Sequence, residues 1–396
     1  MKITRFLPLL LALAGAIHTL TAAPKFSLLT AGPGADMYQL EGHTALRMVT
    51  DNGGDYAVNW GVFDFNAPNF AYRFVKGETD YSIGICPIDL FLYDYSRQGR
   101  YVVEQPLNLT DAEAMELQRL IEINLKPENR EYRYNYVLDN CATRPLALIE
   151  KSLSADGAAL LVDMPPEDAT FRGEMRKYHR NFPAYQLFID LVLGSGIDRP
   201  ISTRERAFAP VFLMDLASHS AIAGADGTSR PLTLGSRELM PDKLGEAKET
   251  GVPVWIFVTI ITASAIIVTW TDIRRKKVSR WYDACFYTIY GLLGCLVAFL
   301  VFISVHEATS PNINLMWANP ICLIIPLFIW FKKCKCIVFY FQIINFALLL
   351  IWLAGQPFYH QSLNWLFIPL VLSDMMRSAC YIYINRKCHQ SAAACR

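Results

Sequence analysis

The C-terminal third of the chain is dominated by apolar segments, and this feature constrains the fold more than any other. After Pro253 there are five of them, near 253–271, 282–305, 319–331, 337–353 and 364–384. A helix needs about 20 apolar residues to cross about 30 Å of hydrocarbon, and most of these segments approach that length. The third is short, and we expect it to be tilted or re-entrant. The sequence therefore predicts an all-α membrane domain of about five transmembrane helices at 253–385.

The connecting loops predict the orientation of these helices. Lys and Arg gather in RRKKVSR (274–280), in KKCKC (332–336) and in the tail at 386–396, but are absent from HEATSPNINLMWAN (306–319) and GQPFYHQS (355–362). By the positive-inside rule, the first set is cytoplasmic and the second lies outside. Five crossings then place everything before Pro253 outside and the C-terminal tail in the cytoplasm.

The N-terminus agrees with this topology. Residues 1–23 contain Lys2 and Arg5, an apolar run and then small residues, which is the pattern of a secretory signal. Pro24 disfavours cleavage, so an uncleaved signal anchor is the alternative. Residues 24–224 are an exported domain with charges throughout, and the polar, Gly- and Ser-containing residues 225–252 are expected to be a linker. The net charge of +1 leaves no basic surplus to suggest nucleic acid as a partner.

The exported domain combines strand and helix patterns, which predicts an α+β fold. Strands are expected at 40–49 and 57–65, joined by the turn DNGGD, and at 129–137. A helix should begin at Thr110, where Glu113 completes a capping box, and end before Pro127. Residues 165–224 are mostly helical in pattern. We expect these helices to pack in the core; a collar resting on the membrane is the alternative.

The segment YNYVLDNCATRPLA (134–147) places Cys141 in a polar turn between a predicted strand and a predicted helix. Backbone N–H groups at a helix start favour a thiolate, which is the nucleophilic form of cysteine. Only two cysteines, Cys86 and Cys141, fall in the exported domain, so a disulfide framework is excluded and a single bridge between them is the competing interpretation.

A cysteine nucleophile needs a base, and the exported domain offers His43, His179 and His219. His43 is the best placed, because a strand fixes its ring and the adjacent Gly42 leaves room for a substrate or for the cysteine-bearing turn. The order is then histidine before cysteine, and catalytic groups recur in several chain orders.

Two residues on the returning strand, Asn59 and Asp64, are candidates to orient the histidine, with Asn59 the closer. An oxyanion at the cysteine would need backbone N–H donors, with help from Asn140 or Arg144.

The motifs GPGADMYQLEGHTALRM, NWGVFDFNAPNFAYRFVKG, GRYVVEQPLNLT and YNYVLDNCATRP, followed by five apolar segments, resemble the cysteine-dependent lipoprotein N-acyltransferases of Gram-negative anaerobes. The resemblance covers nearly the whole chain. It implies a permuted papain-like cysteine fold, as in lecithin:retinol acyltransferase, with Cys141 as nucleophile and His43 as general base.

The resemblance also implies a reaction. An acyl chain would move from a phospholipid to the cysteine, forming a thioester, and then to the α-amine of a diacylglyceryl-cysteine at a lipoprotein N-terminus. A covalent intermediate divides one difficult transfer into two easier steps. The enzyme would be a multi-pass protein of the inner membrane with its catalytic domain in the periplasm, and it would need no metal or cofactor.

The membrane domain offers further candidates for substrate binding. His306, Asn312 and Asn314 lie in a loop predicted to be outside, where they would form one wall of a lipid site or simply part of an interfacial anchor. Arg377 and Asp374 lie three residues apart in the last apolar segment. Charges at that depth are usually paired or functional, so we expect either that the two neutralise each other or that Arg377 holds a lipid phosphate.

Two other functions compete with acyl transfer. With water as acceptor, the same cysteine and histidine would make a membrane-bound hydrolase, either a lipid deacylase or a peptidase. With Cys141 bridged to Cys86, the exported domain would be a non-enzymatic envelope sensor or scaffold. A free or a bridged Cys141 separates the last possibility from the first two.

Overall fold

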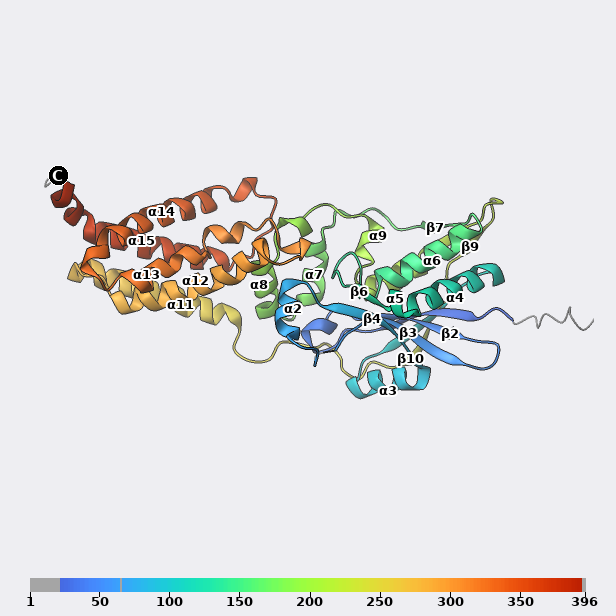
Figure 1. The fold of residues 1–396 in the computed structure, drawn as a ribbon. Helices are drawn as coiled ribbons and strands as arrows, with labels where there is room; N and C mark the ends of the chain where they lie inside the picture. The colour runs from blue at the N-terminus through green and yellow to red at the C-terminus, as the bar shows by residue number, and fades with distance from the viewer. Residues whose placement is uncertain (1–21, 65, 394–396) are drawn as a thin grey trace, which may run out of the picture.

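A computed structural model of the chain describes residues 22–64 and 66–393, with side chains up to Arg386. The molecule is elongated, with a bundle of helices at one end and a mixed α/β domain at the other (Figure 1). This division confirms the predicted α+β domain followed by an all-α membrane domain. The predicted signal segment lies outside the described residues except for its last two positions.

The α/β domain is built on an antiparallel sheet that has seven strands in the described part of the chain. Their order across the sheet is β10 (Arg237–Met240), β5 (Val102–Pro106), β1 (Lys25–Ala31), β2 (His43–Val49), β3 (Asp55–Val62), β4 (Asp80–Pro87) and β6 (Glu131–Arg133). The predicted hairpin is confirmed as β2 and β3, whose turn contains Gly53 with a positive φ of 84°. Glycine adopts this conformation without steric cost.

Helices cover both faces of this sheet (Figure 1). On one face lie α4 (Asp111–Leu125) and α6 (Thr143–Ala155), whose apolar sides pack on buried residues such as Leu46, Val58 and Trp60. On the other face lies α3 (Ile88–Gln98), which packs through Ile88 and Phe91. The capping box predicted for α4 is present in full. Burial of these two apolar layers fixes the sheet between the helices.

The remaining elements of the domain extend it toward the membrane helices and around its edges. They are α2 (Phe70–Lys76), α5 (Pro127–Arg130), β7 (Ala159–Val162), α7 (Phe171–His179), α8 (Pro183–Val192), α9 (Thr203–Arg206), α10 (Pro210–Ser218), β8 (Ser220–Ala223) and β9 (Ser229–Pro231). α10 packs in the α/β core, whereas α8 contributes Leu191 and Val192 to the core of the membrane bundle. Core packing, the expected interpretation, therefore holds for α10, whereas α8 packs against the membrane bundle.

Four helices are long and apolar enough to span a membrane in the described chain: α11 (Val254–Arg275), α12 (Arg280–Phe302), α14 (Lys335–Ala354) and α15 (Phe367–Ala393). A shorter apolar stretch at Ile313–Phe328 lies between α12 and α14 and includes α13 (Ile324–Phe328). Both its start, at Asn312, and the loop after α14, at Ser362, contact the α/β domain. The short stretch therefore runs from one end of the bundle to the other, which argues against the re-entrant alternative for the third apolar segment.

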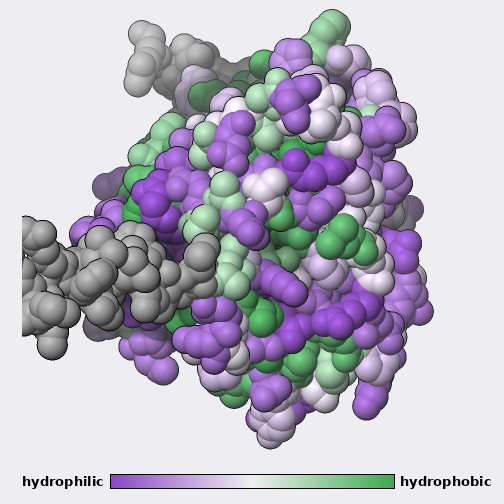
Figure 2. Space-filling view, turned by 90° about the vertical axis from the view of Figure 1, so that its right-hand side faces the viewer, coloured by the Kyte–Doolittle hydropathy of each residue, from purple (hydrophilic) through white to green (hydrophobic). Residues whose placement is uncertain are grey.

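Two predictions about the domain differ from the structure. The strand expected at 129–137 ends at Arg133, because Asn135 and Asp139 pair through their backbones in a tight turn and the Asn135 side chain accepts two further N–H groups. The linker expected at 225–252 contains β9 and β10, and β10 extends the main sheet as an edge strand. The end of the domain farthest from the membrane helices is mainly hydrophilic (Figure 2).

Candidate active site

Cys141 lies immediately before α6, and the neighbouring Asn140 holds it there. The Asn140 Oδ1 atom accepts the backbone N–H groups of Ala142 and Thr143 at 2.8 and 2.9 Å, so it caps the start of the helix. Its Nδ2 group donates to the backbone carbonyls of Tyr136 and Phe208, each at 2.8 Å. Every polar atom of this buried side chain is therefore occupied, and its visible role is to fix the cysteine-bearing turn.

His43 is the first residue of β2, and Asn59 holds its ring from the next strand. The register pairs Ala45 with Asn59, which puts His43 and Asn59 on the same face of the sheet, two positions apart. The His43 Nε2 atom lies 3.1 Å from Asn59 Oδ1, and the Tyr95 ring of α3 is nearly parallel to the imidazole at 6.3 Å. Of the two candidates to orient the histidine, the structure brings Asn59 to it.

The cysteine turn meets the sheet beside this histidine. The backbone N–H of Thr44, the residue after His43, is near enough to the Cys141 sulfur to favour its thiolate form, as is the cysteine's own N–H. On β3, Gly61 faces the cysteine, and an added Cβ would lie at an ordinary contact distance of 3.7 Å from Cys141 Cβ. Glycine suits this position because its φ is 84°.

Gly42 has a different role from the one expected. Its φ is 89°, and an added Cβ would lie 2.6 Å from the carbonyl oxygen of Ala31. The missing side chain therefore admits the neighbouring strand β1, and the glycine that faces the cysteine is Gly61 instead.

The pKa values of the thiol and the imidazole move apart. Burial is the main cause for both: it lowers the pKa of His43 to about 4 and raises that of Cys141 to about 11. The hydrogen bond to Asn59 partly offsets the first shift, and the two backbone N–H donors partly offset the second. At neutral pH the resting site thus holds a neutral imidazole and a neutral thiol.

Two of the predicted site residues have other partners. Asp64 is exposed, and its carboxylate accepts the backbone N–H of Asn66. Arg144 forms a two-bond ion pair with Asp139, and its guanidinium stacks on the Tyr132 ring at 3.4 Å. Both cysteines of the domain, Cys86 and Cys141, are free thiols in the structure.

The loop residues proposed to bind lipid join the two domains. Asn312 and Asn314 are buried and donate to backbone carbonyls of Asp190 and Leu191 in α8, at 2.9 to 3.1 Å. His306 lies 2.9 Å from the carbonyl oxygen of Phe74 in α2. These contacts hold the α/β domain against the membrane bundle.

Arg377 lies in the membrane bundle and is fully buried, but Asp374 is not its partner, so the expected pairing is wrong. Its guanidinium binds Asp283 of α12 at 2.7 Å and Asp272 of α11 at 2.8 Å. Asp374 instead accepts a hydrogen bond from Asn345 of α14 at 2.8 Å. Residues three apart share one side of a helix, yet here they turn to different neighbouring helices, which only the packing of the bundle decides.

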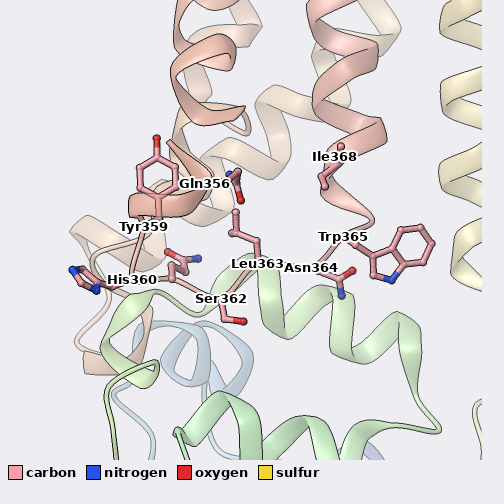
Figure 3. A pocket seen from close by; sticks show the side chains of 9 residues that line it. Gln356, Tyr359, His360, Ser362, Leu363, Asn364, Trp365 and Ile368 are labelled. Carbon is pink, nitrogen blue, oxygen red and sulfur yellow. The ribbon is translucent and has the colours of Figure 1, made fainter. Parts of the chain in front are cut away.

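A cavity of about 420 Å³ lies at the outer end of the membrane bundle, apart from the cysteine (Figure 3). Its lining residues all fall between Gln356 and Ile368, in and around the loop that joins α14 to α15. The same loop contacts the α/β domain, where Arg176 donates to Ser362 and Asn364 donates to Asp190. The cavity is thus a feature of the domain junction, and none of the predicted site residues lines it.

Sequence reasoning missed two side chains that lie at the site, Tyr95 and Arg100. Tyr95 stacks on His43, and the Arg100 guanidinium lies 4.8 Å from the centre of the Tyr95 ring. Their one local signal is Gly99, which ends α3 with a φ of 71° and turns the chain so that Arg100 follows directly. That pattern is common at helix ends and does not by itself indicate a site.

Comparisons with known proteins give two family matches. Residues 20–170 match the Lnb N-terminal periplasmic domain, and residues 246–388 match the Lnb transmembrane domain. The chain is also 27% identical over 133 residues to the NADH-ubiquinone oxidoreductase chain 4 of Strongylocentrotus purpuratus, a likeness that covers 25% of this chain and 29% of that protein. The chain thus spans less than a third of that relative's length. No solved structure matches the chain.

Proposed function

The chain belongs to the Lnb family, and from this premise we propose that it is a lipoprotein N-acyltransferase in which Cys141 carries the acyl chain as a thioester. The family's two domains fit a membrane-associated role in lipoprotein processing, with a periplasmic domain on a multi-pass membrane domain. The acyl transfer, the cysteine nucleophile and a location in the inner membrane are parts of the proposal.

One observation carries the proposal: the Cys141 sulfur lies against the backbone of Thr44, next to a histidine whose Nε2 is held by Asn59. Because the Asn59 oxygen accepts a hydrogen bond, Nε2 carries the proton and Nδ1 keeps its lone pair. The neutral imidazole is then ready to remove the thiol proton as the sulfur attacks. Two N–H groups next to the sulfur, from Thr44 and Cys141, are the candidate donors to an oxyanion.

In the first half-reaction, the Cys141 sulfur attacks the ester carbonyl carbon of a phospholipid while its proton passes to His43. The tetrahedral intermediate collapses, the ester C–O bond breaks, and the lysophospholipid alkoxide takes the proton back from His43. The products are a thioester on Cys141 and a lysophospholipid.

In the second half-reaction, the α-amine of the diacylglyceryl-cysteine attacks the thioester carbonyl. His43 accepts a proton from the attacking nitrogen and returns it to the departing sulfur, so the free thiol is restored. The docked membrane domain supports both steps, because donor and acceptor are each anchored in the same leaflet and would meet the cysteine without leaving it.

A test compares lipoprotein N-termini from cells that carry wild-type protein, Cys141→Ala or Cys86→Ala. Mass spectrometry of the lipoproteins should show triacylated N-termini with wild type and with Cys86→Ala, and diacylated ones with Cys141→Ala. Cys86 is a suitable control because it is a second free thiol in the same domain. Triacylated lipoproteins in the Cys141→Ala cells would refute the proposal, and free fatty acid without acylated amine would favour a hydrolase.

A further inference from the structure

Arg100 is buried, and the groups that accept its hydrogen bonds do not balance its positive charge. Its side chain is 3% exposed. The Nε and Nη1 groups donate to the carbonyl oxygen of Gly32 at 2.7 Å and to Gln98 Oε1 at 3.1 Å, and both acceptors are neutral. The buried Nη2 atom has no hydrogen-bond partner. Among the residues the structure describes, Arg100 forms no ion pair with a carboxylate.

Such an arrangement is costly in a folded protein. A buried guanidinium is normally paired with a carboxylate, since removal of a charge from water is expensive without a partner. Other buried arginines of this chain follow that rule: Arg172 binds Asp190 and Asp198, and Arg377 binds Asp272 and Asp283. Arg100 differs from both, which indicates that its counter-charge is supplied by a ligand.

The position of Arg100 connects that ligand to the cysteine. Its guanidinium lies over the Tyr95 ring, and the same ring lies beside the His43 imidazole. It is also close enough to act electrostatically on both reacting groups, although burial is the larger influence on each. No hydrogen bond joins it to the sulfur, which already has the backbone donors of Thr44 and Cys141. An anion at Arg100 would therefore lie beside the reacting centre without occupying it.

Arg100 shares a hydrogen-bond partner, Gln98, with a short segment whose apolar side chains are exposed. This segment is η1 (Met37–Gln39), in which Met37 and Tyr38 are 59% and 61% exposed. Gln39 joins it to the end of α3 through one exposed hydrogen bond to Gln98, the same residue that accepts from Arg100.

We propose that Arg100 binds the phosphodiester of the acyl-donor lipid and thereby places the lipid's ester at Cys141. This inference rests on the proposed function, because it names the group that the donor presents. Arginine suits the role, since its planar donors match phosphate oxygens. In a glycerophospholipid the ester and the phosphate are attached to one glycerol. The Arg100 guanidinium lies near the cysteine but does not contact its sulfur, which fits the spacing between these two groups.

The test measures thioester formation on Cys141 by intact-protein mass, using full-length protein in detergent micelles. Two donors are compared, phosphatidylglycerol and p-nitrophenyl palmitate, an ester without phosphate. For Arg100→Gln, the ratio of the two rates should fall about 10- to 100-fold, as for loss of a charged hydrogen bond, and Arg100→Lys should recover part of it. Arg97→Gln is the matched control, because Arg97 is an exposed arginine in the last turn of α3, three residues before Arg100. An unchanged ratio in Arg100→Gln would overturn the inference, whether both rates fall together or neither falls.

Two further measurements complete the test. One distinguishes a lipid phosphate from a free phosphate, and the other distinguishes failure of this inference from failure of the proposed function. Inorganic phosphate that blocks acylation of wild type but not of Arg100→Gln would assign the site to a soluble anion and overturn the lipid assignment. If wild type forms an adduct with p-nitrophenyl palmitate but none with phosphatidylglycerol, the proposed function fails. The inference is then decided by binding alone: Cys141→Ser should retain phosphatidylglycerol in mixed micelles more strongly than Cys141→Ser/Arg100→Gln, and equal retention would overturn it.

Discussion

His43 Nε2 and Asn59 Oδ1 lie 3.1 Å apart across two neighbouring strands, and this contact fixes which imidazole nitrogen is basic. The asparagine oxygen accepts the Nε2 proton, so the lone pair remains on Nδ1. The same asparagine points its Nδ2 group toward Cys86, at 3.9 Å from the sulfur. The orientation of the proposed base thus depends on one side chain of β3.

Replacement of Asn59 by alanine should lower the single-turnover rate of Cys141 acylation by about 10- to 100-fold, part of the contribution of an oriented general base. Asn59→Asp should move the acid limb of the pH profile upward, because a nearby carboxylate raises the pKa of an imidazole. Rate measurements on Asp64→Ala discriminate between Asn59 and Asp64, the two residues that the sequence offered to orient the histidine. A larger loss in that variant than in Asn59→Ala would reverse the assignment.

Alkylation of Cys141 by iodoacetamide should rise about tenfold per pH unit from pH 7 to pH 10. Only the thiolate reacts, and burial raises the pKa of this thiol to about 11, so the thiolate fraction grows throughout that range. His43, with its pKa lowered to about 4, stays neutral over the whole range. Peptide mass spectrometry gives the rate at each pH. A rate that levels off below pH 8 would instead indicate a thiolate–imidazolium pair.

Asn314→Ala should destabilise the junction between the two domains by about 1–3 kcal/mol, since it leaves buried polar groups without a partner. Asn314 donates to the carbonyl oxygens of Asp190 and Leu191 and accepts from the Trp317 indole. A lower melting temperature in detergent and earlier proteolysis between the domains are the expected readouts. Normal stability with impaired acylation would instead support the role in lipid binding that the sequence suggested.

Arg377→Met should destabilise the membrane bundle by about 3–5 kcal/mol, because Asp272 and Asp283 would lose their buried counter-ion. Thermal unfolding in detergent measures the effect. Addition of Asp272→Asn and Asp283→Asn should restore much of the stability, since no unpaired charge then remains. If Arg377→Met were stable but no longer accepted acyl chains from phospholipid, Arg377 would belong to the lipid site after all.

Much of the architecture follows from local patterns. Apolar length predicts the membrane helices, the capping box predicts the start of α4, and the turn DNGGD predicts the β2–β3 hairpin, because each depends on residues close together in the chain. The short length of the third apolar segment was likewise visible, but its path through the bundle was not. The edge strand β10 was not, since it is held by pairing with β5, more than 130 positions earlier in the sequence.

The sequence by itself determined which residue types are available: one cysteine before a helix, one histidine on a strand, and charges within the last apolar segment. Only the tertiary structure decided their partners. It brought Thr44 to the Cys141 sulfur, chose Asn59 over Asp64, gave Arg377 to Asp272 and Asp283, and left Arg100 buried without a counter-charge. Periodicity and composition report the local backbone and the burial of a segment, whereas a partner is set by the packing of elements that the chain brings together from far apart.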